Sequence, residues 1–307
     1  MKVAVTGSSG LIGTALVAAL RADGHEVVRL VRGGPAADDT GPWDPRAERG
    51  GLDPRLLNGT AAVVHLAGAG IAAKRWTGGY RAEIRNSRVQ GTRALARALT
   101  AMATPPRVLL AGSAIGWYGD TGGREVTESD APGQGFLPEL VRDWEAAAEE
   151  AAPAGIRVMT LRSGLVLSPK GGVLGRLLPL FRLGLGGRIG SGRQVMSGIG
   201  LSEWVAAARF LLARDGVTGP VNLTTPSPVS NAEFTAALAA AVHRPAVMPV
   251  PVPALKIAVG GVSSDVLSSA RVLPRRLLAE GYRFQHAGIA GALAAELSPD
   301  RPVTSPA

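Results

Sequence analysis

The feature that most constrains the fold stands at the amino terminus, where a short apolar strand runs through a glycine-rich turn into a helix. Residues 2–6 read as a strand, and residues 11–21 place apolar side chains on one side at helical spacing. The turn between them reads Gly7-Ser8-Ser9-Gly10, and Gly13 follows within the first helical turn. A glycine motif in this context is typical of the first unit of a dinucleotide-binding sheet.

Each glycine of this loop has a physical role in such a motif. Gly7 permits the tight turn, Gly10 lets the backbone approach a pyrophosphate, and Gly13 lets the helix pack closely on the sheet. The N–H groups at the helix start then face the anion. The alternative is a plain glycine-rich turn with no ligand. We predict a dinucleotide site formed by seven consecutive residues: Gly7, Ser8, Ser9, Gly10, Leu11, Ile12 and Gly13.

The second strand, residues 26–31, favours NADP(H) over NAD(H). An NAD site usually has an acidic residue at the end of this strand, where it bonds the ribose hydroxyls. Here Arg29 and Arg32 stand in its place, and alternation puts them on opposite faces of the sheet. Arg32, at the strand end, is the better candidate for a 2′-phosphate. The alternative for either arginine is a solvated surface position.

Strands and helices alternate through the first half of the chain, which predicts an α/β fold with a doubly wound parallel sheet, an extended Rossmann fold. Further strands are expected at residues 61–66, 107–111 and 156–161, and helices at 80–102 and 137–151. Residues 33–60 are rich in Gly, Pro and Asp and read as loop with one short helix.

The second half of the chain has a different texture. We predict that the Rossmann domain spans residues 1–167 and that residues 168–297 interleave completion of the sheet with a small substrate-side subdomain. Helices are expected at 201–214 and 231–242, and a strand at 220–223 returns to the sheet. Residues 298–307 read as a flexible tail.

Composition excludes several classes of site and partner. The chain has no cysteine, so thiolate metal sites and cysteine nucleophiles are excluded, no metal site is expected, and a cytoplasmic location fits. No apolar run is long enough to cross a membrane. The formal net charge is +9, but the arginines are scattered singly and only three Tyr and five Phe are available for base stacking. We therefore expect neither a membrane nor a nucleic-acid partner.

Several stretches resemble one family. The segment His65-Leu66-Ala67-Gly68 is similar to the third-strand signature of extended short-chain dehydrogenases. Others resemble a narrower, atypical group described as nucleoside-diphosphate sugar epimerase-like, and the resemblance runs from about residue 1 to about residue 295. These stretches are residues 75–77, 83–88, 91–93, 112–120, 142–145, 161–167, 181–187, 231–234 and 272–277.

The resemblance implies a nicotinamide cofactor, usually NADP(H), and a small-molecule substrate. It places Leu66, Ala67 and Gly68 on the cofactor side of the third strand's end. It also implies that Glu83 and Arg88 approach the cofactor, although periodicity alone would read them as charges on a helix face. Ser113 matches the family's active-site serine at the end of the fourth strand. Its alternative role is a strand-end hydroxyl that satisfies the backbone.

Two departures limit what the resemblance implies about chemistry. Short-chain dehydrogenases normally use a Tyr-x-x-x-Lys pair for proton exchange, and none of the three tyrosines here has a lysine four residues on. Tyr118 is the nearest tyrosine to Ser113 in sequence and our second catalytic candidate. Without a nearby lysine its phenol would be a poor base at neutral pH, and its alternative role is packing beside Trp117.

The second departure is that Gly198 and Gly200 stand where the family commonly has Trp and His. Either the substrate site is enlarged and repurposed, or these positions only serve packing. The leading prediction is an NADP(H)-dependent oxidoreductase or epimerase that acts on a small polar substrate. The main alternative is an NADP(H)-binding sensor or scaffold without catalysis.

Overall fold

The computed structural model describes residues 1–33, 39–46, 51–71, 73–249 and 268–298. Its centre is a seven-stranded sheet in the order β11-β7-β5-β4-β1-β2-β3, in which every neighbouring pair is parallel. The strands are β1 (Lys2–Thr6), β2 (Glu26–Val31), β3 (Thr40–Pro42), β4 (Thr60–His65), β5 (Val108–Ala114), β7 (Arg157–Ser163) and β11 (Gly219–Leu223).

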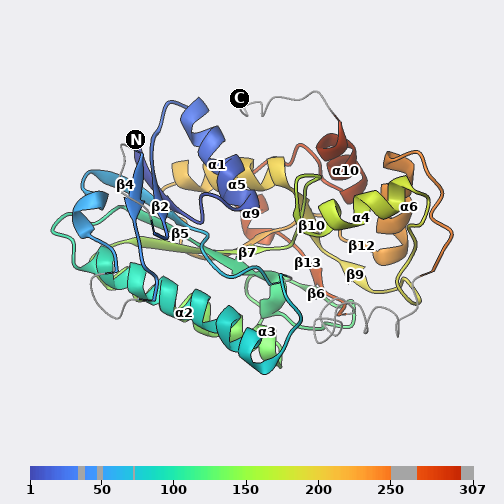
Figure 1. Cartoon of the computed structure of the whole chain (residues 1–307), viewed down its shortest axis with the longest axis horizontal. Helices are drawn as coiled ribbons and strands as arrows, with labels where there is room; N and C mark the ends of the chain where they lie inside the picture. Colours follow the sequence, from blue (N-terminus) through green and yellow to red (C-terminus); the bar gives the residue numbers. More distant parts are fainter. Residues whose placement is uncertain (34–38, 47–50, 72, 250–267, 299–307) are drawn as a thin grey trace.

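The predicted α/β class is confirmed, because helices cover both faces of this sheet (Figure 1). Helices α1 (Leu11–Ala22) and α5 (Leu201–Ala213) pack on one face, and α2 (Gly78–Thr100) and α3 (Phe136–Glu149) on the other. Strand β1 shows the cause: Val3 and Val5 enter one apolar core, whereas Ala4 enters the opposite one. A parallel strand buried on both faces reads as continuous apolar sequence.

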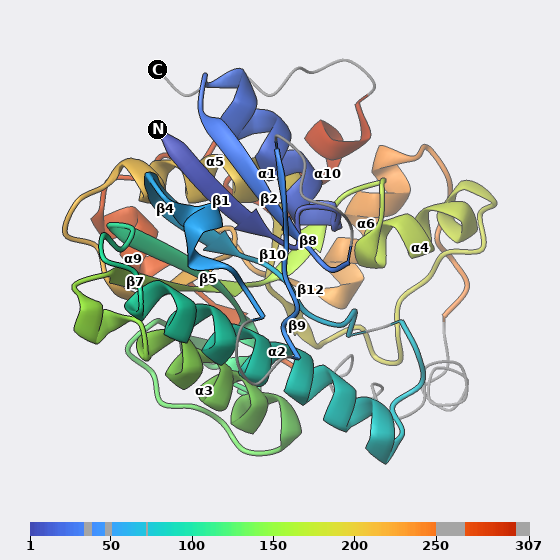
Figure 2. The same ribbon diagram turned by 60° about the vertical axis from the view of Figure 1, so that its left-hand side comes forward.

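A smaller group of elements lies at one side of the sheet, as both views show (Figure 2). Its own apolar core joins α4 (Gly172–Arg182), α6 (Asn231–Ala241) and α10 (Ile289–Leu297). Short strand pairs connect it to the sheet. These pairs are β8 (Leu165–Leu167) with β10 (Gly198–Gly200), β9 (Val195–Met196) with β12 (Val229–Ser230), and β6 (Glu125–Val126) with β13 (Arg271–Val272).

The second half of the chain is interleaved in space, since α5 and β11 return to the main sheet between elements of the smaller group. Helix α9 (Arg275–Ala279) lies beside β11, and its Leu277 enters the core of the sheet. None of the described helices is long and apolar enough to span a bilayer. Apart from Ser298, the expected tail lies outside the described residues.

Several elements were not predicted from the sequence, and β3 and α4 are two of them. Strand β3 has only three residues, Thr-Gly-Pro, a composition that β-propensity disfavours, and it forms at the edge of the sheet where Pro is tolerated. The short helix expected in the same region is a single 3₁₀ turn, Pro54–Leu57. Helix α4 was not predicted because its start is rich in glycine and Pro179 stands inside it, and both features are atypical of a helix.

Candidate cofactor and active site

The glycine loop between β1 and α1 lies at the carboxyl edge of the sheet, where the strand order reverses between β1 and β4. Gly7 has a φ of +65°, and a Cβ there would lie 2.7 Å from the carbonyl carbon of Leu66. A Cβ on Gly13 would lie 2.2 Å from the Gly7 oxygen. These two glycines are therefore required by packing within the protein.

Gly10 differs from the other two glycines. It is exposed, and the nearest atom to an added Cβ would be the Gly7 oxygen at 3.2 Å. The fold leaves room for a small side chain at this position, so packing within the protein does not require a glycine here. An approaching pyrophosphate is the ligand that such a position accommodates.

The start of α1 offers donors to such a ligand. Gly10 is its N-cap residue, and no side chain caps the helix and no acidic residue stands in its first turn. The positive end of the helix dipole is therefore not neutralised by the protein. Ser8 adds a buried hydroxyl that has no hydrogen-bond partner, while Ser9 is exposed and Leu11 and Ile12 pack against the sheet core. A dinucleotide phosphate fits this cradle.

A buried hydrogen-bond chain holds the adjacent end of β4. The Thr6 hydroxyl accepts from the two backbone N–H groups that follow His65, at 3.1 and 3.2 Å, so it donates its own proton to His65 Nδ1 at 2.7 Å. His65 Nε2 then donates to Thr92 Oγ1 at 3.0 Å, which also accepts from Trp144. Burial lowers the pKa of His65 to about 4, so the ring is neutral. The predicted residues Leu66 and Ala67 are fixed by this chain.

A cavity of about 280 Å³ lies beyond the ends of β2 and β4, and Arg32 and Glu83 both line it. Its full lining is Arg32, Pro45, Arg46, Ala69, Glu83, Asn86, Ser87 and Gln90. Arg29 is used elsewhere, because it forms an ion pair with Asp39 at 3.1 Å. The structure therefore separates the two arginines of β2 as alternation predicts, and places Arg32 at the cavity.

Arg88 lies near this cavity but does not line it. Its guanidinium donates to the Ala69 carbonyl at 2.9 Å and stacks on Trp144, with 5.1 Å from its Cζ to the ring centroid. Gly68 is in contact range of the same side chain. Burial lowers the pKa of Arg88 to about 10. In this structure Arg88 positions the segment that follows β4.

Ser113 belongs to a buried polar network at the ends of β5 and β7. Its Oγ donates to Glu145 Oε1 at 2.5 Å. The Glu145 carboxylate also accepts hydrogen bonds from Nε and Nη2 of Arg162, each at 2.8 Å. Both members of this ion pair are almost fully buried. Arg162 in turn stacks on Trp117, with 3.9 Å from its Cζ to the ring centroid. Glu145 lies on α3 and Arg162 on β7, so the network joins two neighbouring elements.

Tyr118 lies at the far end of the same network. Its hydroxyl accepts from Arg162 Nη1 at 3.1 Å and donates to Asn222 Oδ1 at 2.8 Å. The side chain is 3% exposed, and burial raises the pKa of the phenol to about 12. The network thus joins Ser113 to Tyr118 through Glu145 and Arg162. The phenol hydroxyl both donates to and accepts from other residues of the protein.

The two glycines of β10 face α10. A Cβ on Gly198 would lie 3.0 Å from Ile289 Cδ1, and one on Gly200 would lie 3.1 Å from a carboxylate oxygen of Glu296. Ile199, between them, points into the sheet core. Helix α10 therefore fills the space of the missing aromatic and imidazole side chains. This packing favours the second of the two readings, because the glycines open no extra room.

Sequence reasoning missed Arg46 at the cavity and Glu145, Arg162 and Asn222 in the network. Glu145 and Arg162 both stand within stretches that carry the family resemblance, and an ionisable residue in a buried helix or strand was the available signal. Their mutual contact was not readable, because 17 residues and a change of element separate them.

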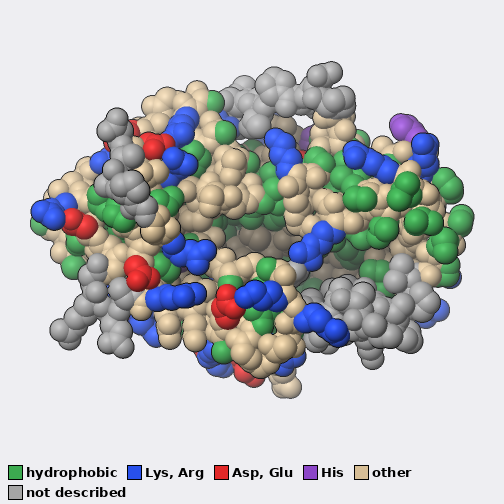
Figure 3. Space-filling view, viewed as in Figure 1, with side chains coloured by type: hydrophobic (Ala, Val, Ile, Leu, Met, Phe, Trp, Pro, Cys, Tyr) green, Lys and Arg blue, Asp and Glu red, His purple; other side chains and the backbone are tan. Residues whose placement is uncertain are grey.

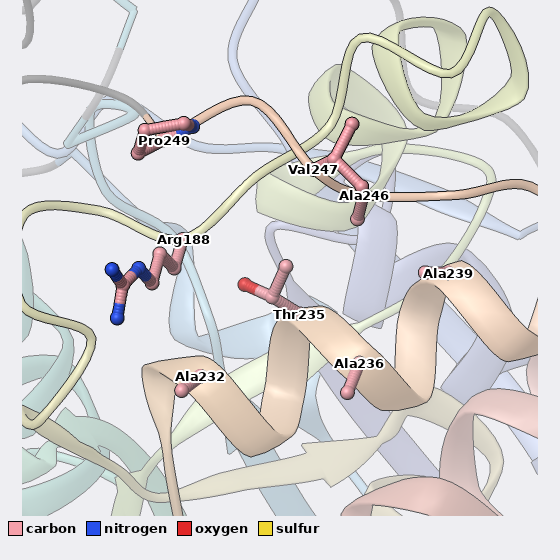
Figure 4. A pocket seen from close by; sticks show the side chains of 8 residues that line it. All are labelled: Arg188, Ala232, Thr235, Ala236, Ala239, Ala246, Val247 and Pro249. Atoms are coloured by element: carbon pink, nitrogen blue, oxygen red, sulfur yellow. The ribbon is translucent and has the colours of Figure 1, made fainter.

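A second cavity contains none of the predicted site residues. This cavity, of about 460 Å³ on the smaller group, lies between α6, the Arg188 loop and residues 246–249, and small side chains form most of its wall (Figure 4). The face in Figure 3 is hollowed between the sheet and the smaller group, with basic side chains near the rim. The described residues contain no cluster of His, Cys, Asp and Glu able to hold a metal.

Comparison with known proteins identifies the family of the chain. The model of the NAD dependent epimerase/dehydratase family matches residues 3–197, and that of a domain of unknown function (DUF1731) matches residues 250–296. Epimerase family protein Mb2239 of Mycobacterium bovis is 46% identical over 292 residues, which cover 95% of this chain and 96% of that protein.

Many solved structures share the fold, and two of them that cover 97% of this chain are 34% identical to it. Human epimerase family protein SDR39U1, crystallised with NADPH, has a TM-score of 0.88 and 34% identity, and 99% of its chain is covered. The nucleoside-diphosphate sugar epimerase of Corynebacterium glutamicum has a TM-score of 0.79 and 34% identity, with 58% of its chain covered.

Proposed function

The chain belongs to the NAD-dependent epimerase/dehydratase family, within its atypical epimerase-like group, and on that premise we propose that it binds NADP(H) and transfers a hydride to or from a small polar substrate. The observation that carries the proposal is the open cradle at Gly10 next to the Arg32 cavity. The similar human protein was crystallised with NADPH, which supports the same cofactor here.

The residues assigned to this cofactor act in three groups. The glycine loop and the uncapped start of α1 would bind the diphosphate. Leu66, Ala67 and Gly68 would line the adenosine side, with Arg32 at the 2′-phosphate and Glu83 nearby. Arg88 would hold the segment after β4 in place. NADP(H), when bound, supplies or accepts the hydride.

We assign proton handling to Ser113 and Glu145. Because the Ser113 hydroxyl donates to Glu145, its lone pairs are left to accept a hydrogen bond from a substrate hydroxyl. As hydride leaves the substrate carbon, the hydroxyl proton passes to Ser113, and the serine proton passes to Glu145. The reverse sequence serves carbonyl reduction. Tyr118 acts as a positioning residue, since it holds Arg162 against Glu145.

A second candidate function is an NADP(H)-binding sensor or scaffold. The observation in its favour is that Tyr118 is buried, that its hydroxyl donates to Asn222 and accepts from Arg162, and that burial raises its pKa to about 12. Because the chain has no Tyr-x-x-x-Lys pair, the usual proton donor of the wider dehydrogenase class is absent, and the buried Tyr118 does not replace it. The two candidates share the cofactor and differ only in whether the hydride moves.

The test follows the hydride. The protein is loaded with NADPH that carries deuterium at C4 and incubated with a metabolite extract, and mass spectrometry searches for deuterated metabolites. We expect label in a polar metabolite, lost in Ser113→Ala and kept in the control Ser129→Ala, whose side chain is exposed. Tight NADPH binding without transfer of label would instead support the sensor or scaffold.

A further inference from the structure

Arg46 lines the same cavity as Arg32, although the two residues reach it from different strand ends. Both side chains are exposed, and neither forms an ion pair with any residue that the structure describes. Asp39, which lies midway between them in sequence, is already bound by Arg21 at 2.5 Å and by Arg29 at 3.1 Å, and Asp44 accepts from the backbone of Arg46 and not from its guanidinium. The cavity therefore has two guanidinium groups and no described carboxylate paired to either.

The backbone at Arg46 is held in place by its neighbours. Trp43 is buried and packs edge-on against His65, with 5.5 Å between the ring centroids. The Arg46 N–H donates to the Asp44 carboxylate at 2.9 Å, which closes a tight turn. Pro45 packs on α2, where a Cβ on Gly91 would lie 3.3 Å from the proline Cβ. Arg46 is thus presented to the cavity by a packed turn.

Helix α2 supplies the other wall of the cavity. Glu83, Asn86 and Gln90 follow the i, i+3, i+7 spacing that places side chains on one helix face. Their amide and carboxylate oxygens can accept from an exocyclic amine, and Lys74 balances the charge of Glu83 at 3.4 Å. The cavity therefore combines two cations that have no ion-pair partner among the described residues with a wall of acceptors, which matches an adenosine that carries a phosphate.

The geometry points to Arg46 as the second cation of the 2′-phosphate site and thus as a determinant of the preference for NADP(H) over NAD(H). A phosphate has three acceptor oxygens, and two planar guanidinium groups engage more of them than one does. Arg32 binds from the end of β2 and Arg46 from the turn after β3. This inference rests on the proposed function, because it requires a dinucleotide on the glycine loop.

The test uses two small probes that differ only by the phosphate, adenosine 2′,5′-bisphosphate and 5′-AMP, in calorimetric titrations. Arg46→Ser should weaken binding of the bisphosphate by roughly tenfold, the equivalent of one charge-assisted contact, and change binding of 5′-AMP less than about twofold. Arg55→Ser is the control, because Arg55 is exposed and pairs only with Asp53 two residues away. Unchanged melting temperatures verify that each variant is folded.

The outcomes separate this inference from the proposed function. A wild-type protein that prefers the bisphosphate, with the preference kept in Arg46→Ser but lost in Arg32→Ser, overturns the role of Arg46 and leaves the function standing. A wild-type protein that binds both probes equally, or neither, overturns both. Loss of 5′-AMP binding in Arg46→Ser to the same degree as the bisphosphate also overturns it, because Arg46 would then hold the cavity and not the phosphate.

Discussion

At the carboxyl edge of the sheet, the glycine loop leaves its helix start uncapped and a buried serine hydroxyl unpaired, whereas a few strands away Ser113, Glu145, Arg162 and Tyr118 bond to one another. The first region has donors without acceptors, and Arg32 and Arg46 extend it with cations without described partners. The second region has matched each charge with its opposite.

The difference indicates what each region needs from outside. Donors and cations without partners are stable when an anion supplies the missing acceptors, so the first region is organised for a ligand. The buried pair of the second region is costly to desolvate and is retained only with good geometry and further hydrogen bonds. It therefore depends on its own members, and removal of one member should be felt by the whole fold.

The largest predicted effect is on the second region. Glu145→Ala leaves Arg162 buried without its carboxylate, which should lower the free energy of unfolding by about 3–5 kcal/mol. Urea titration measures this loss. Glu150→Ala, which breaks an exposed ion pair to Arg93 beside the same helix, should cost only about 0.2–1 kcal/mol. Equal losses in the two variants would show that the network is no different from the surface.

The next effect concerns the support beneath the first region. The folded pKa of His65, about 4, lies below the ordinary value of 6.5, so the unfolded chain binds the extra proton first as pH falls. The free energy of unfolding should therefore be highest above pH 6.5 and should be lower by about 3 kcal/mol at pH 4.

Unfolding free energy measured from pH 7 to pH 4 gives this slope. His65→Gln should remove most of it even if the variant is less stable overall, and His25→Gln should keep it. A slope unchanged by loss of His65 would assign the proton uptake to another group and break the link to the Thr6–His65 chain.

The glycine loop should lose its ligand without losing its fold. Gly10→Val adds bulk on the exposed side of the loop and should weaken NADPH binding by roughly a hundredfold, about 2.7 kcal/mol. Calorimetry measures the affinity and a thermal melt checks the fold. Gly79→Val is the control, since nothing lies within 4 Å of a Cβ at that position. Wild-type affinity in Gly10→Val would mean that the dinucleotide binds elsewhere.

The smallest effect sharpens the choice of cofactor within the first region. Arg32→Asp replaces a cation at the cavity with an anion and should weaken NADPH relative to NADH by roughly tenfold or more. The ratio of the two affinities is the readout, because it cancels general damage to the loop. An unchanged ratio would remove Arg32 from the 2′-phosphate site.

The sequence predicts the strand, turn and helix of the first region because the pattern that specifies them is local. One strand, one glycine turn and one helix suffice to locate Gly7, Gly10 and Gly13, and Arg32 follows from strand length and alternation. Arg46 was not predicted as a site residue, because β3, the strand before it, has only three residues and a composition that disfavours strands. Its place at the cavity depends on Trp43 and Pro45, whose packing partners are remote in sequence.

The second region is built from contacts between segments that are distant in sequence, and no local sequence pattern predicts these contacts. Ser113 and Tyr118 could be named from a family motif, but the hydroxyl of Tyr118 meets Asn222 across 104 residues. The meaning of Gly198 and Gly200 likewise depended on where α10 packs. Periodicity predicts that a helix has a buried face, and tertiary packing decides which polar side chains share it.

The most direct test of the contrast is a crystal structure of the protein with NADPH. The account predicts the diphosphate against the backbone N–H groups of residues 10–12, the 2′-phosphate between Arg32 and Arg46, and the bonds of Ser113, Glu145, Arg162 and Tyr118 unchanged from those described here. A dinucleotide bound away from the glycine loop, or a Tyr118 hydroxyl released from Asn222 to meet the nicotinamide, would contradict it.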